Sequence, residues 1–93
     1  MARLLAELPG WEARGDRLLR TFALPDFAAA MRFVNAMAEV AEAEGHHPDF
    51  CVHYNRVEVS LWTHAIGGLS ENDFVLAAKV SSLDEVYLDR IDP

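Results

Sequence analysis

Three of the four histidines in this 93-residue chain lie within eight positions, at His46, His47 and His53. Histidine is the side chain whose unperturbed pKa, about 6.5, lies closest to neutrality, so it can both accept and donate a proton near pH 7. Pro48 follows the adjacent pair; it favours an extended backbone for the residue before it and fixes its own φ. The pair is therefore held in place, and the cluster indicates acid/base chemistry on a small molecule.

Two acids and a fourth histidine are candidate partners of this pair. Glu42 precedes His46 by one helical turn, a spacing that lets a carboxylate steady an imidazole, although it also suits an ordinary helix surface. His64 follows an apparent strand and can join the cluster. Asp73 is the fourth residue of Ser-Glu-Asn-Asp, and the pattern alone favours a capping-box role for it.

A metal site is possible here but is disfavoured. Adjacent side chains on an extended backbone point to opposite sides, so His46 and His47 are not expected to hold one ion. The ligand spacings CxxC and HExxH are absent, which leaves only a site made of His47, His64 and an acid. Cys51 is expected to pack rather than to act as a nucleophile, and His53 is expected on the solvent face of a strand.

Composition places the chain among globular proteins, with 52% apolar and 25% charged residues. No linker divides it, so we expect one domain over 1–93, and its small size favours self-association. A net charge of −7 argues against direct binding to nucleic acid or to anionic membranes. The sequence shows no secretory signal and no membrane span, and it has a single cysteine, which together favour a cytoplasmic location.

The elements that would position these residues begin with a short helix over 2–8, ended by Pro9 and Gly10. Residues 11–13 and 17–24 form an expected hairpin around Gly15-Asp16. Asp26 then caps a long helix that ends at Gly45 and leaves Glu42 and Glu44 unfavourably in its last turn. Its expected apolar stripe contains Phe27, Ala30, Met31, Val34, Met37, Ala38 and Ala41.

A second hairpin follows over 50–54 and 57–63, with its turn at Asn55-Arg56. Alternation places Val57, Val59 and Leu61 toward the helices, and puts Trp62 on the other face as a pocket wall or subunit contact. A last helix starts after Ser70, with a break or bend at Ser81-Ser82; its apolar face contains Leu76, Ala77, Val80, Leu83 and Tyr87. The pattern predicts an α+β fold, a four-stranded antiparallel sheet with helices packed on one face, in the order α-β-β-α-β-β-α.

Several short motifs together resemble the pterin-4a-carbinolamine dehydratases. They are Glu42-x-x-x-His46-His47-Pro48-Asp49-Phe50, Tyr54-Asn55-Arg56-Val57, Thr63-His64 and Gly68-Leu69-Ser70-x-x-Asp73. The resemblance spans roughly 9–88. One departure is Phe50, where many relatives carry tryptophan, and it leaves the pterin preference open.

The resemblance implies dehydration of 4a-hydroxytetrahydropterin to quinonoid dihydropterin, without metal or organic cofactor, in cofactor recycling after aromatic amino-acid hydroxylation. It implies proton transfer by His46 and His64, and pterin binding by His47 with a share in catalysis. Glu42 and Asp73 would orient these groups or bind the ring, and Pro48 would shape the wall. It further implies a homodimer formed by joining sheets, or a homotetramer in which such dimers pair, with an aromatic amino-acid hydroxylase as a pathway partner.

Two other classes of function remain open. Some members of the family serve as dimerisation partners of transcription regulators, so a binding module is the main alternative. A zinc-dependent hydrolase is the third, and stoichiometric metal in the purified protein would favour it.

Overall fold

A computed structural model describes residues 10–62 and 71–89. Two β-hairpins and two long helices follow one another, as β1 (Glu12–Arg14), β2 (Arg17–Ala23), α2 (Phe27–Glu44), β3 (Asp49–His53), β4 (Arg56–Leu61) and α3 (Glu71–Asp89). The antiparallel sheet has the order β1-β2-β4-β3, so the second hairpin adds to the first through β4. The predicted helix over 2–8 lies outside the described residues.

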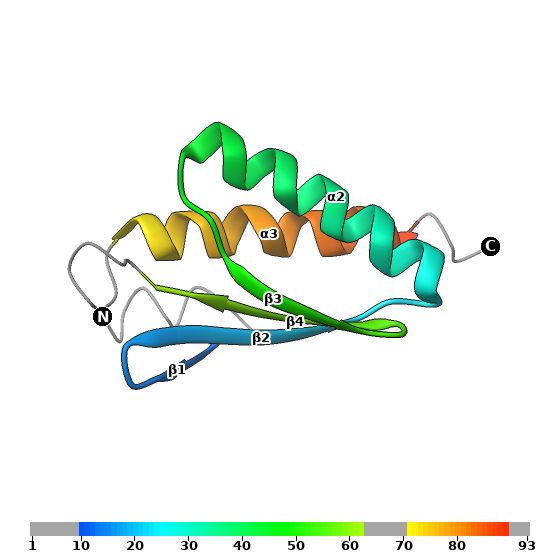
Figure 1. Cartoon of the computed structure of the whole chain (residues 1–93), viewed down its shortest axis with the longest axis horizontal. Coiled ribbons are helices and arrows are strands. Elements are labelled where there is room, and N and C mark those ends of the chain that lie inside the picture. Colours follow the sequence, from blue (N-terminus) through cyan, green and yellow to red (C-terminus); the bar gives the residue numbers. More distant parts are fainter. Residues whose placement is uncertain (1–9, 63–70, 90–93) are drawn as a thin grey trace.

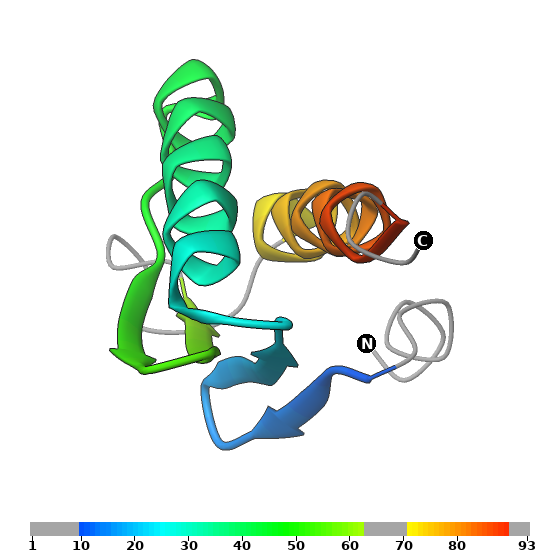
Figure 2. The same ribbon diagram turned by 90° about the vertical axis from the view of Figure 1, so that its right-hand side faces the viewer.

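Both helices cover the same face of the sheet, α2 above the β3–β4 hairpin and α3 nearer β2 (Figures 1 and 2). The predicted α+β architecture is therefore confirmed for the described elements. The strands present alternate residues to this layer, and Val57, Val59 and Leu61 are buried as predicted. The other face of the sheet is uncovered by any described element and is called the open face below.

Helix α2 begins and ends where the sequence predicts. The side chain of Asp26 accepts a hydrogen bond from the Ala29 N–H at 2.8 Å, and Gly45 ends the helix at φ 65°. The predicted apolar stripe is partly wrong: Phe27 and Ala38 are exposed, whereas Ala29 and Phe33 are fully buried. The cause is that α2 packs against both β4 and α3, so its buried stripe is displaced relative to the predicted one.

Helix α3 continues through Ser81 and Ser82, so of the predicted break or bend there the break is wrong. Ser82 Oγ donates to the Ala78 carbonyl at 3.2 Å, an arrangement that a helix accommodates. Ser81 Oγ accepts from Trp11 Nε1 at 2.8 Å and from an Arg20 guanidinium N–H at 2.9 Å. These contacts tie α3 to the first hairpin.

The two hairpins turn in the same way, each through two residues. Gly15 and Tyr54 stand at the first turn position, with φ of 63° and 54°. The second turn is therefore Tyr54-Asn55 rather than the predicted Asn55-Arg56. Two hydrogen bonds join this turn to the loop before α2. Asn55 Nδ2 donates to the Leu24 carbonyl at 2.9 Å, and the Leu24 N–H donates to the Asn55 carbonyl at 2.8 Å.

Candidate active site

The end of α2 fixes the backbone from which both adjacent histidines project. The N–H of Gly45 donates to the Glu42 carbonyl at 3.2 Å, and the N–H of His46 donates to the Ala41 carbonyl at 3.1 Å. This pair of bonds is a Schellman motif, which requires a left-handed residue after the helix, here Gly45. His46 is therefore anchored by its own main chain, and the next residues lead directly into β3.

His46 contacts a buried carboxylate on the other helix. Its Nε2 lies 2.5 Å from Asp73 Oδ1, with the His46 side chain 17% exposed and that of Asp73 0% exposed. A carboxylate can only accept, so Nε2 carries the hydrogen and donates it. Neutral His46 then has its lone pair on Nδ1, the atom available to take a proton.

His47 has a carboxylate partner of its own on α2. Its Nε2 lies 3.1 Å from Glu42 Oε1, and the two side chains are 64% and 78% exposed. An exposed pair of this kind stabilises the fold by at most about 1 kcal/mol. Both groups therefore remain accessible to a ligand. The predicted spacing from Glu42 to His46 gave the wrong partner, because His46 turns toward α3.

The structure thus brings four of the predicted site residues into two histidine–carboxylate pairs. Pro48 is half-buried in the segment that joins the pairs to β3. His64, with Ser70 of the predicted capping box, lies outside the described residues. Sequence reasoning did not identify Lys79, whose Nζ lies 2.6 Å from Glu44 Oε2 and compensates an acid at the negative end of α2. Nothing in the spacing of residues 35 positions apart could have indicated that contact.

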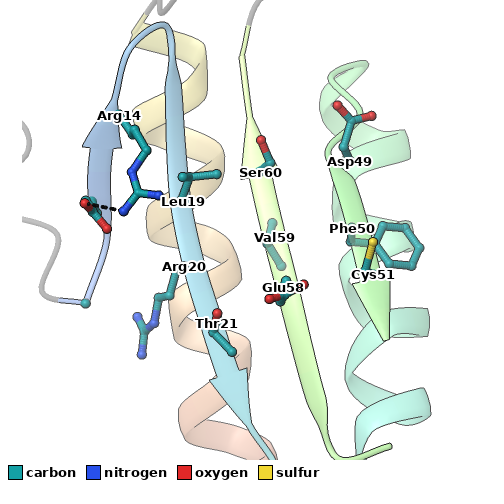
Figure 3. Close-up of a pocket in the computed structure, with 12 residues that line it drawn as sticks. Arg14, Leu19, Arg20, Thr21, Asp49, Phe50, Cys51, Glu58, Val59 and Ser60 are labelled. Carbon is teal, nitrogen blue, oxygen red and sulfur yellow. Dashed lines mark hydrogen bonds and ion pairs between the residues drawn. The ribbon is translucent and has the colours of Figure 1, made fainter. Parts of the chain in front are cut away.

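A hollow of about 520 Å³ lies on the open face, and none of His46, His47, Glu42 and Asp73 lines it. Figure 3 shows its side chains across all four strands. Cys51 lines this hollow and is exposed, which contradicts the expectation that it packs. His53 is exposed, as predicted. Within residues 10–62 and 71–89, neither α2 nor α3 has the length and apolar composition of a membrane-spanning helix.

Comparison with known proteins places these features in context. The family model of pterin 4 alpha carbinolamine dehydratase matches residues 1–83. One relative is a provisionally named pterin-4-alpha-carbinolamine dehydratase of Stenotrophomonas maltophilia. It is 54% identical to this chain over 87 residues, which cover 91% of this chain and 75% of the relative. One of Thermomicrobium roseum, likewise provisionally named, is 51% identical over 83 residues, with 89% of each covered.

Two solved structures share the fold. A transcriptional coactivator/pterin dehydratase from Brucella melitensis superposes with a TM-score of 0.87 at 35% identity, covering 90% of this chain and 92% of that one. A pterin dehydratase-like protein identified as a RuBisCO assembly factor in the alpha-carboxysome has a TM-score of 0.67 at 24% identity, with 80% and 86% covered. The second likeness concerns the fold alone.

Proposed function

Because the chain belongs to the pterin 4 alpha carbinolamine dehydratase family, we propose that it dehydrates a 4a-hydroxytetrahydropterin to the quinonoid dihydropterin. In this reaction the bond between C4a and the hydroxyl oxygen breaks. The electron pair of an N–H bond becomes the second bond between carbon and nitrogen, its proton goes to a base, and an acid protonates the leaving oxygen as water. The reaction therefore needs one proton acceptor and one proton donor, both active near neutrality.

The observation that carries the proposal is the contact between His46 and buried Asp73. Since Asp73 holds the hydrogen on Nε2, Nδ1 of His46 is a lone-pair acceptor of fixed direction. We assign the removal of the pterin N–H proton to this atom. The imidazolium that forms is then stabilised by the carboxylate beside it.

His47 and Glu42 supply the complementary task of binding. Their exposure leaves the free nitrogen of His47 and the carboxylate of Glu42 accessible to the N–H and carbonyl groups of a pterin ring. Pro48 would form part of the wall. His64 is assigned as the proton donor to the departing hydroxyl, on the sequence resemblance alone.

The test is the rate of 4a-carbinolamine breakdown above that in buffer. We expect His46→Ala and His64→Ala each to lower turnover by about a hundredfold or more. His53→Ala is the matched control, since His53 pairs with Glu58 on the open face and has no assigned catalytic role. A folded wild-type protein no faster than buffer would refute the dehydratase, and full activity in both variants would refute the assignment.

A binding role is the second candidate, favoured by the Brucella structure described as both coactivator and dehydratase. A specific transcription regulator whose binding survives His46→Ala would support it. Self-association into dimers or tetramers also stays a prediction, measurable by sedimentation. A hydroxylase as pathway partner and a cytoplasmic location stay predictions as well.

A further inference from the structure

Three side chains with metal-binding atoms meet on the open face, and the proposed dehydration uses none of them. Cys51 on β3 stands directly opposite Glu58 on β4, and His53 lies two residues along β3, on the same face (Figure 3 shows the first two). The thiol sulfur, an imidazole nitrogen and a carboxylate oxygen all lie within 4.8 Å of one another. His53 Nε2 is already 3.0 Å from Glu58 Oε1.

The chemistry of this set selects one class of ion. Thiolate and imidazole are ligands of zinc-class transition metals, whereas magnesium and calcium require oxygen alone. Metal–ligand bonds of about 2.0–2.3 Å at tetrahedral angles place the ligand atoms roughly 3.3–3.6 Å apart. Atoms up to 4.8 Å apart therefore have to approach by about 1.5 Å at most, whereas the His53 and Glu58 atoms at 3.0 Å already lie close to the required separation. Exposed side chains can make such a movement.

The backbone beneath the three side chains is held by paired strands. Cys51 and Glu58 are cross-strand neighbours within the β3–β4 ladder, so their separation is set before any ion arrives. The local charge also favours a cation, since a bound thiolate and Glu58 carry two negative charges. Arg56, opposite His53, contributes one positive charge.

We propose that Cys51, His53 and Glu58 bind one zinc-class divalent ion, with water at its fourth position. Cys51 and Glu58 also line the hollow of the open face. The metal-bound water would therefore lie at the edge of this hollow. His46 contacts α3 on the helix-covered side. The metal site and the proposed pterin site are thus separate, and either can fail without the other.

Titration of the purified full chain with Co²⁺ tests the site, because thiolate bound to cobalt gives a charge-transfer absorption band. We expect saturation at one ion per chain and competition by Zn²⁺. Cys51→Ser should abolish the band. His53→Gln and Glu58→Gln should each weaken Co²⁺ binding by tenfold to a hundredfold or more. Mutating a residue that only hydrogen-bonds a metal ligand already lowers metal affinity by about this factor, and removing the ligand itself should cost at least as much.

The matched control is His47→Gln, which removes a second exposed histidine–carboxylate pair among the described residues, at the end of α2. The single cysteine of the chain, Cys51, belongs to the proposed metal site and is unchanged in this variant. The Co²⁺ affinity and band of His47→Gln should equal those of the wild type. Absence of the charge-transfer band would overturn the proposal. A stoichiometry of one Co²⁺ ion per two chains would also overturn it. The same holds if both His53→Gln and Glu58→Gln keep the wild-type affinity for Co²⁺, or if His47→Gln no longer binds Co²⁺.

Discussion

Replacing Asp73 with asparagine tests whether this residue acts through His46. Asparagine has nearly the shape of aspartate, but its amide can present an N–H where the carboxylate could only accept. The proton of His46 would then move from Nε2 to Nδ1, and the base would lose its lone pair. We expect turnover to fall about a hundredfold or more, which corresponds to about 2.7 kcal/mol of transition-state free energy.

Loss of folding is too small to explain such a decrease. A hydrogen bond to a charged group contributes about 1.5–3 kcal/mol, and full burial of Asp73 favours the upper value. A domain with a free energy of unfolding of about 5 kcal/mol would retain about 2 kcal/mol, so about 97% of the molecules would stay folded. Unfolding would therefore lower turnover by a few per cent.

The assay is a double-mutant cycle on kcat at saturating pterin, with His46→Gln, Asp73→Asn and the double variant. If Asp73 only positions His46, the double variant should be within about threefold of His46→Gln, because the group it positions is already gone. Asp49→Asn, on the open face, is the control for the substitution itself and should keep wild-type turnover. Two losses that multiply to about ten-thousandfold would refute the positioning role.

The remaining predictions concern binding and stability. Glu42→Gln and His47→Gln should raise KM more than they lower kcat in steady-state assays, and should shift the free energy of unfolding by less than about 1 kcal/mol because the pair is exposed. Tyr54→Gly should stabilise the protein by about 0.5–1 kcal/mol in urea unfolding, because glycine adopts the φ of 54° without steric cost. Gly45→Ala should destabilise it by about 1 kcal/mol in the same measurement; a Cβ there meets nothing within 4 Å, so the cost is conformational.

The boundaries of α2 could be predicted because their causes are local. Asp26 accepts from a backbone N–H three residues away, and Gly45 adopts a conformation that few other residues tolerate. The alternation of buried and exposed side chains in β4 could also be predicted, because a strand with one buried face has an apolar residue at every second position. The turn at Tyr54 was misplaced because tyrosine is rarely found at positive φ.

The partners within the site could not be predicted in this way. His46 and Asp73 are 27 positions apart, and Glu44 and Lys79 are 35 apart, so only the packing of α2 against α3 brings them together. The local rule of one helical turn linked Glu42 to the wrong histidine, since helical geometry stops before His46. Cysteine is usually buried, which is why the exposure of Cys51 was missed as well.

The helix end explains why two adjacent histidines can have different tasks. The Schellman motif uses the N–H of His46 to close α2, which directs this side chain toward α3 and its buried carboxylate. The next side chain, that of His47, lies instead beside Glu42 on α2 and remains exposed to solvent. A single left-handed glycine thus separates a sheltered imidazole suited to proton transfer from an accessible one suited to binding. Gly45→Ala should therefore lower turnover as well as stability, because it moves both imidazoles relative to their carboxylates.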